Sequence, residues 1–305
     1  MSRNFLGGHS RLQKISLCGV SFPALPNLLL SFRDLVELQL LEILSSGYVS
    51  PEAVVAGLSN LSRLKTLEIG YSSLRSCTIT GTRPPLPILS TLSTLTEFRF
   101  KGSCEYLEDL IARLDTPSLQ ECCISFFREV VFDVPQLTQF ICCAEALSSP
   151  DKALIHSSET VSFRFWQGRS TGSPIVGSFS LSFPFSHLNW QLSCVAQICF
   201  HSSPLLSGVK RLSIDLPPKD PDWLDDAGVE EWTGVFPSFV AVEELYVSEP
   251  LGQHVAQALA LPRTTGHTEM LPALRSVVFE GPQKFALTPE ILKPLPPPAG
   301  SPIAP

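Results

Sequence analysis

The sequence lacks a long uninterrupted apolar segment. Its best candidate, residues 25–44, is broken by charged residues such as Arg33 and Glu37, whereas a helix that crosses a bilayer needs about 20 apolar residues in succession. Residues 1–20 contain no apolar run that ends in a small-residue cleavage site, so they do not resemble a secretory signal. We therefore expect an intracellular protein, cytoplasmic or nuclear, without a membrane-spanning helix.

The chain also lacks clustered positive charge. It has 22 lysines and arginines against 29 aspartates and glutamates, a formal net charge of −7, and the basic residues form no block. A nucleic-acid partner requires cations that displace counterions from phosphates, and an anionic membrane surface attracts basic segments. We therefore expect neither nucleic acid nor a membrane as partner.

Several motifs of catalysis and cofactor binding are missing as well. The sequence contains no phosphate-binding loop, no dinucleotide fingerprint and no His-Glu-x-x-His zinc motif. Its 6 histidines lie in separate segments, without a carboxylate or nucleophile at a recognisable distance. We predict a protein that is not an enzyme and has no cofactor, and we keep a catalytic site assembled across an unusual α/β fold as the alternative.

The 9 cysteines are an odd number, and several stand where a buried apolar residue is expected, which favours a reducing compartment. The pairs Cys122-Cys123 and Cys142-Cys143 lack the spacing of zinc ligands, and adjacent residues of a strand point to opposite faces. Cys194 and Cys199 fit the apolar stripe of a helix. We expect the cysteines to pack in the core and predict no metal site.

What the sequence does contain is a recurring motif, apolar-x-x-apolar-x-apolar, as in Leu64-Lys-Thr-Leu67-Glu-Ile69. The alternation at its end is typical of a strand that is buried on one face. Distances between copies vary around the length of one leucine-rich repeat. The copies begin at Leu12, Leu35, Leu64, Leu95, Leu119, Leu137, Val209, Val242 and Leu274.

Between the copies, the apolar spacing becomes helical. Ser50-Pro51-Glu52 combines an N-cap, a proline at the first helical position and an acid in the first turn, and Ser103 can cap a second helix. Apolar stripes in residues 188–199, 229–239 and 251–259 predict further helices. Alternating strands and helices normally form a parallel sheet.

We therefore predict an α/β fold: an irregular leucine-rich-repeat solenoid over residues 11–285, with a curved parallel sheet and helices on its convex side. Residues 1–10 are expected to form an N-terminal tail, and the proline-rich residues 286–305 a disordered tail. Residues 148–184 show two alternating segments separated by a Gly/Ser-rich turn, without a helix between them. This region is either two short repeats without helices or an inserted hairpin.

Several segments follow one another in an order that is characteristic of a known group of repeat proteins. They include Arg11-Leu-Gln-Lys-Ile-Ser-Leu, Gly47-Tyr-Val-Ser-Pro-Glu-Ala, Phe132-Asp-Val-Pro-Gln-Leu-Thr-Gln-Phe, Val242-Glu-Glu-Leu-Tyr-Val and Leu271-Pro-Ala-Leu-Arg. Through these segments the sequence resembles the leucine-rich-repeat region of F-box-domain-containing proteins from basidiomycete fungi, over roughly residues 11–281. The resemblance implies that the repeats bind a client, while an F-box docks a Skp-type adaptor and a cullin ubiquitin ligase. No F-box-like segment precedes Leu12, so we expect a member without a recognisable F-box.

In a leucine-rich repeat the leucines point inward, so the intervening residues line the concave sheet. A wide face of mixed charge suits a protein partner better than a small molecule. We predict a client-binding module related to F-box receptors, or alternatively a standalone scaffold or regulator without a link to ubiquitin. The candidate contact residues are Lys14, Glu37, Gln39, Lys65, Glu68, Glu97, Arg99, Gln120, Thr138, Lys210, Glu243 and Tyr246.

Overall fold

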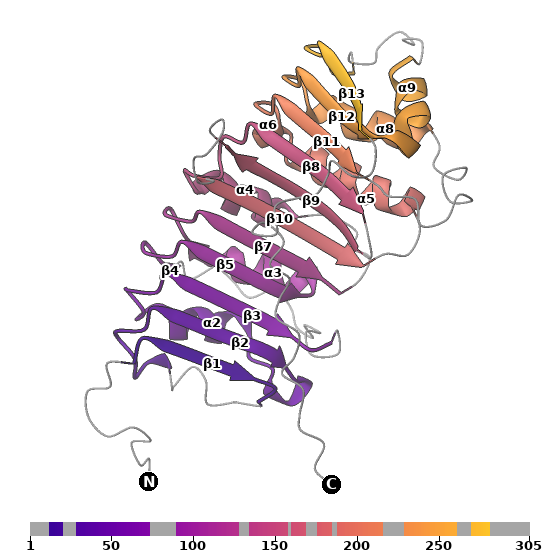
Figure 1. The fold of residues 1–305 in the computed structure, drawn as a ribbon. Helices are drawn as coiled ribbons and strands as arrows, with labels where there is room; N and C mark the ends of the chain where they lie inside the picture. Colours follow the sequence, from indigo (N-terminus) through magenta and orange to yellow (C-terminus); the bar gives the residue numbers. More distant parts are fainter. Residues whose placement is uncertain are drawn as a thin grey trace.

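The computed structural model describes residues 12–20, 29–73, 90–127, 134–157, 160–168, 176–184, 188–215, 229–260 and 270–280. Its main feature is an 11-stranded sheet with the strand order β1-β2-β3-β5-β7-β10-β9-β8-β11-β12-β13 (Figure 1). A separate small sheet pairs β4 (Ser90–Thr91) with β6 (Leu114–Asp115). The strands of the large sheet are β1 (Lys14–Cys18), β2 (Glu37–Ile43), β3 (Thr66–Tyr71), β5 (Glu97–Gly102), β7 (Glu121–Phe126), β8 (Lys152–Ser157), β9 (Thr160–Gln167), β10 (Gly177–Pro184), β11 (Arg211–Asp215), β12 (Glu244–Ser248) and β13 (Ser276–Glu280).

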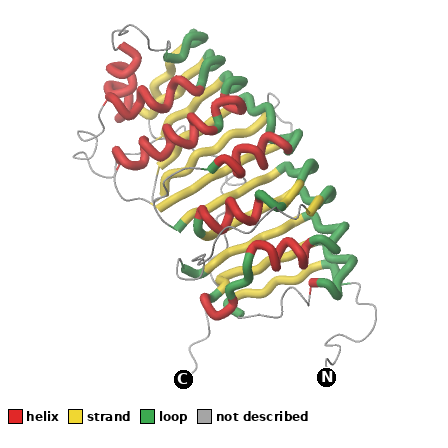
Figure 2. Tube along the Cα trace, turned by 180° about the vertical axis from the view of Figure 1, so that it is seen from behind, coloured by secondary structure: helices red, strands yellow, loops and turns green. Residues whose placement is uncertain are grey.

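The helices lie together on one face of this sheet, as the view from behind in Figure 2 shows. The expected mixed α/β fold, with a large and mostly parallel sheet and helices on one side of it, is confirmed. The helices are α2 (Pro51–Leu58), α3 (Cys104–Ile111), α4 (Pro135–Cys143), α5 (Leu188–His201), α6 (Ser203–Leu206), α8 (Val229–Val235) and α9 (Gly252–Ala260), with 3-10 turns η1 (Ser45–Gly47), η3 (Phe236–Ser238) and η4 (Glu249–Leu251).

Two apolar rows cross the sheet on the side of the helices and form its core. Strand register places the second apolar residue of each motif next to its equivalents, as Leu38, Leu67 and Phe98 show. All three side chains are 0% exposed. Burying one such side chain contributes about 1.5–3 kcal/mol, so the repeated motif itself supplies the free energy that holds neighbouring strands together.

The predicted helix starts at Ser50 and Ser103 are confirmed. The Ser50 hydroxyl accepts a hydrogen bond from the backbone N–H of Ala53 at 3.3 Å, and Ser103 accepts one from that of Tyr106 at 3.4 Å. Each serine thereby satisfies one of the N–H groups that a helix leaves without an intrahelical partner. The first of these helices also begins with Pro51, which has no N–H to lose.

Polar contacts join consecutive helices into one layer. The Tyr106 hydroxyl of α3 donates to the backbone oxygen of Val49 at 2.8 Å, and the guanidinium of Arg113 donates to Glu52 of α2 at 2.6 Å. The carboxylate of Glu108 in α3 accepts hydrogen bonds from the backbone N–H groups of Gln136 and Leu137 at 3.0 and 2.9 Å. Helices α2, α3 and α4 are thus linked through buried or half-buried groups.

The prediction of a strand at residues 137–142 is wrong, because this segment is helix α4. Its residues Leu137, Phe140 and Ile141 are buried along one side of the helix. The apolar-x-x-apolar part of the motif spaces residues by three, which a helix satisfies as well as a strand does. Pro135 at the first turn and the capping carboxylate of Glu108 favour the helix.

Residues 148–184 contain the antiparallel hairpin of β9 and β10, one of the two predicted alternatives, and a further strand, β8, that we did not predict. Strand β9 runs antiparallel to β8 and to β10, whereas β10 is parallel to β7 and β8 is parallel to β11. The insert therefore adds three strands without changing the direction of the flanking ones. The expected tails, residues 1–10 and 286–305, lie outside the described residues.

Candidate functional site

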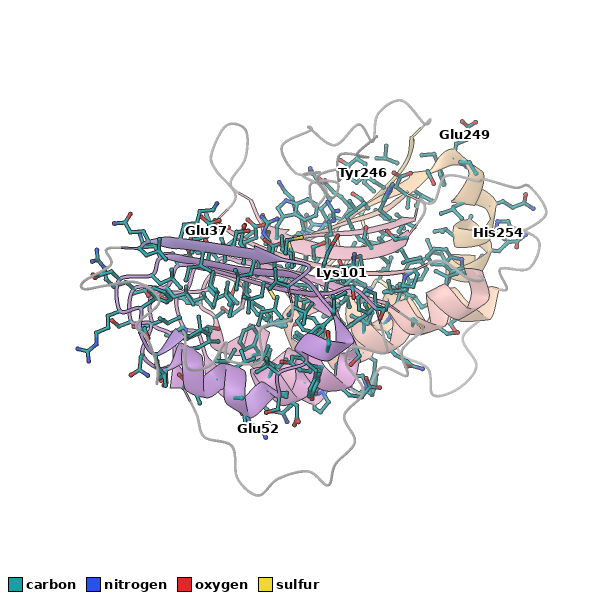
Figure 3. The ribbon with its side chains drawn as sticks, turned by 90° about the horizontal axis from the view of Figure 1, so that it is seen from below. Glu37, Glu52, Lys101, Tyr246, Glu249 and His254 are labelled. Atoms are coloured by element: carbon teal, nitrogen blue, oxygen red, sulfur yellow. The ribbon has the colours of Figure 1, made fainter. Side chains whose placement is uncertain are left out.

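The face of the sheet opposite the helices, here called the open face, is lined by the alternate residues of each strand. Figure 3 shows Glu37 and Tyr246 on this side and Glu52 on the helix side. Strand register arranges its side chains in two long rows. The first contains Lys14, Glu37, Thr66, Glu97, Glu121, Ser178, Trp166, Lys152, Arg211, Glu244 and Ser276, and the second Ser16, Gln39, Glu68, Arg99, Cys123, Ser180, Arg164, Leu154, Ser213, Tyr246 and Val278.

Most of the predicted contact residues lie on the open face. The structure brings seven of the predicted residues into the two rows: Lys14, Glu37, Gln39, Glu68, Glu97, Arg99 and Tyr246. Lys65, Gln120, Lys210 and Glu243 each stand one residue before a strand, in the turn that leads into the sheet. Thr138 is not on the sheet, because it belongs to α4 on the helix side.

Acidic residues dominate the first half of the open face, on strands β1 to β7. Ion pairs join Lys14 to Glu37 at 2.7 Å and Arg99 to Glu121 at 2.6 Å. Between these pairs, Glu68 is only 7% exposed. Its burial raises the pKa of the carboxyl group, Glu37 and Glu97 act in the same direction, and Arg99 and Gln39 oppose the shift.

The middle of the open face has small side chains. Ser178, Ser180 and Ser182 of β10 face the same side, and the hydroxyls of Ser125 and Ser182 share a hydrogen bond of 2.8 Å. Burial, together with the Glu121 carboxylate, raises the pKa of the neighbouring Cys123 thiol to about 11. At neutral pH this thiol is protonated, which makes it a poor nucleophile and metal ligand.

Aromatic and basic residues dominate the second half of the open face. The guanidinium of Arg211 donates to Glu244 at 2.8 Å and lies 5.1 Å from the centre of the Tyr246 ring. The Tyr246 hydroxyl also donates to Glu244, at 3.3 Å. This network holds the three side chains in one arrangement.

A histidine and a carboxylate pair further along the same strands. The Nδ1 atom of His156 and the Oδ2 atom of Asp215 lie 3.0 Å apart, and both side chains are mostly buried. Ser162 stands opposite His156 in the sheet, but its hydroxyl donates to the His156 backbone oxygen, and the residue as a whole is 4% exposed. In the described contacts, the Ser162 hydroxyl therefore bonds to the backbone of His156 and not to its imidazole ring.

Several residues of the open face escaped the sequence analysis. Trp166, Arg164 and Lys152 lie on β9 and β8, whose pairing the repeat motif does not indicate. The alternation Val161-x-Phe163-x-Phe165 could have indicated the residues on β9. When these apolar side chains face the core, Arg164 and Trp166 must face the opposite side of the sheet. The sequence analysis also missed that Gly168-Arg-Ser-Thr-Gly172 has the spacing of a nucleophile elbow. That turn requires a strand followed by a helix, whereas this segment follows β9 and precedes strand β10.

The cysteines fit the core prediction in part. Cys122 is buried and Cys123 lies on the open face, as expected for neighbours in a strand, and Cys194 and Cys199 are buried in α5. The expectation that Cys142 and Cys143 pack in the core is wrong, because both are exposed at the end of α4. Within the ranges that the structure describes, no three His, Cys, Asp or Glu side chains are grouped as metal ligands would be.

An apolar hollow lies at the first end of the sheet, between β1 to β3 and α2. Leu17, Leu41, Val54 and Tyr71 are among its lining residues, none of which is charged. Acid and base chemistry needs a titratable group at the reacting atoms. The hollow offers only the Tyr71 hydroxyl in that respect.

Comparisons with known proteins give one distant likeness. No family model matches the chain, and no curated protein sequence matches it. Among solved structures, it is similar to the leucine-rich-repeat-containing protein LegL7 from Legionella pneumophila, with 12% identity, a TM-score of 0.34, and coverage of 85% of this chain and 69% of that one. In the part of the chain that the structure describes, no helix is both long and apolar enough to span a membrane.

Proposed function

We propose that the chain is a leucine-rich-repeat solenoid that binds another protein on its open face. The observation that carries this proposal is the asymmetry of the sheet: one face is buried beneath helices, while the other presents two rows of polar and aromatic side chains across 11 strands. Neighbouring strands lie about 4.8 Å apart, so the face is roughly 45–50 Å wide. A surface of this width matches a protein partner.

The side chains of the open face support binding rather than catalysis. The Cys123 thiol has its pKa raised to about 11, and the carboxylates of Glu37 and Glu121 are held in ion pairs. Ion pairs and hydrogen bonds of this kind keep a polar surface ordered and suited to a complementary partner. We accordingly propose a non-enzymatic module of an intracellular protein.

The finer proposal, a client-binding region related to F-box ubiquitin-ligase receptors, is supported by the sequence resemblance alone. It is tested by capturing the tagged chain from its native cells and identifying the proteins that accompany it. Recovery of a Skp-type adaptor and a cullin supports the ligase link. Recovery of other partners without them favours the alternative, a scaffold or regulator unrelated to ubiquitin.

The open face is tested in the same capture with two variants. Ser180→Trp places a large ring in the middle of the open face, where Ser180 lies between Cys123 and Arg164. Glu105→Trp places the same ring on the exposed side of α3 and serves as the control. We expect the first variant to lose the partners that wild type and control retain, and equal recovery by all three would contradict the proposal.

A further inference from the structure

The second half of the open face has the composition of a binding hot spot. Trp, Tyr and Arg are the residues that contribute most often to binding energy at protein interfaces. On strands β1 to β7, the two rows contain no aromatic residue. On the neighbouring strands β9, β8, β11 and β12, they contain the set that we call the basic aromatic patch: Trp166, Arg164, Lys152, Leu154, Arg211, Ser213, Glu244 and Tyr246.

Two hydrogen-bond donors of this patch converge beside Gly168. A Cβ atom placed on Gly168 would lie 3.0 Å from the Nζ atom of Lys152 and 3.5 Å from the Nε1 atom of Trp166. The backbone N–H of Gly168 donates to the Asp151 carboxylate at 2.9 Å, which holds the residue directly after β9 against the start of β8. An ammonium and an indole N–H can only donate, so the group that satisfies both is an acceptor, and a carboxylate is the strongest acceptor that proteins carry.

Within the two rows, the charges of the two halves differ in sign. The patch has three cations, Lys152, Arg164 and Arg211, and one anion, Glu244. The two rows on β1 to β7 have two cations and four anions: Lys14, Arg99, Glu37, Glu68, Glu97 and Glu121. An acidic partner is therefore attracted to the patch and repelled by the other half, which fixes both its position and its orientation.

Burial makes an anion more favourable at the patch. The pKa of Arg164 is lowered because its guanidinium is removed from water. An incoming carboxylate beside a partly desolvated cation gains more electrostatic energy than one beside a cation in bulk water. Arg164 and Lys152 lie on adjacent strands, diagonal to each other across the register of β8 and β9.

We infer that the basic aromatic patch docks an acidic segment of a partner protein, with an Asp or Glu carboxylate of that segment hydrogen-bonded to Lys152 Nζ and Trp166 Nε1. This inference rests on the proposed function, because it names the partner chemistry of the same face. The other half of the open face then contacts the less acidic flank of the partner.

The test is selection of a phage-displayed library of random dodecapeptides on the full chain. The most enriched peptide is synthesised with a fluorophore, and its Kd is measured by fluorescence anisotropy. Lys152→Gln removes the ammonium and keeps the length of the side chain, while Trp166→Phe removes the indole N–H and keeps an aromatic ring. Lys101→Gln, on β5 in the other half of the open face, is the matched control.

We expect peptides rich in Asp and Glu, whose Kd rises about tenfold or more with Lys152→Gln, as for a lost charge-assisted hydrogen bond. A smaller rise is expected with Trp166→Phe and no change with Lys101→Gln. The inference is overturned if the enriched peptides are not acidic, or if Arg99→Gln weakens their binding and Lys152→Gln does not. Either result leaves the open face as the binding surface. If the Kd is unchanged by every one of these variants, and also by Ser180→Trp, the peptide does not bind the open face, and this result contradicts the proposed function itself.

Discussion

Replacing Glu108 by alanine should destabilise the protein through helix α4, although Glu108 belongs to α3. Helix α4 has Val134 at its N-cap and no side-chain hydrogen bond from that residue. The Glu108 carboxylate, 8% exposed, instead accepts from the N–H groups of Gln136 and Leu137 at 3.0 and 2.9 Å. One carboxylate therefore replaces the missing cap and connects two helices.

The magnitude follows from these two bonds. A hydrogen bond to a charged group contributes about 1.5–3 kcal/mol, and a carboxylate at a helix N-terminus adds about 0.3–1 kcal/mol. Water reaches the N–H of half-buried Gln136 once the carboxylate is gone, so we expect a loss of about 3 kcal/mol. At an unfolding entropy of about 2.1 cal/mol/K per residue, 305 residues give about 0.64 kcal/mol/K. A loss of about 3 kcal/mol therefore lowers Tm by about 5 °C.

Thermal unfolding followed by circular dichroism measures this effect. Glu108→Gln retains one acceptor oxygen and should lose about half as much stability. Glu105→Ala removes an exposed acid from the first turn of α3 and is the control for helix dipole and composition; we expect a loss within about 1 kcal/mol. The capping argument fails if Glu108→Ala melts at the same temperature as Glu105→Ala.

Four further predictions concern individual side chains. Maleimide should label both Cys142 and Cys143 in the native protein, because both are exposed on α4. Labelling of only one would favour a strand at this segment, because adjacent residues of a strand point to opposite faces. Cys123 should react slowly at pH 8, since its thiol pKa is about 11, and labelling as fast as that of Cys143 would contradict that environment. Glu68→Gln should raise Tm at pH 7, because the raised pKa of Glu68 means that the folded state disfavours its charge. This gain in Tm should vanish as the pH falls below 4.5, where the carboxyl group is protonated in both the folded and the unfolded state. A gain in Tm that does not depend on pH would refute the electrostatic cause. Leu67→Asp should unfold at least the neighbouring repeats, because a charge placed at a fully buried position lacks a partner; an unchanged melting curve would show that the register is wrong.

Strands could be predicted from the sequence where the repeat motif was complete. In Leu64-Lys-Thr-Leu67-Glu-Ile69 the polar residues separate the apolar ones strictly enough to fix both the strand and its buried face. The same reasoning failed at Leu137, where a spacing of three also fits a helix and the deciding contact comes from distant Glu108. A motif within one segment contains no information about a cap that another helix supplies.

The insert and part of the candidate site could not be predicted for a related reason. Strand β8 has three apolar residues in a row, Ala153, Leu154 and Ile155, so it shows no alternation, and Leu154 is 4% exposed although it lies on the open face. The antiparallel direction of β9 follows from its pairing with β8 and β10, which the motif does not encode. The patch around Trp166 exists only once these strands are side by side.

Carboxyl footprinting of the chain, free and bound to its captured partner, tests the central claim most directly. Glu37 and Glu97 stand on the open face, and Glu52 and Glu105 on the helix side, as Figure 3 shows for Glu37 and Glu52. Glycine ethyl ester with a carbodiimide modifies accessible carboxylates, and mass spectrometry measures the extent at each residue. Protection of Glu37 and Glu97 with unchanged Glu52 and Glu105 is the predicted result, whereas protection confined to Glu52 and Glu105 would contradict binding on the open face.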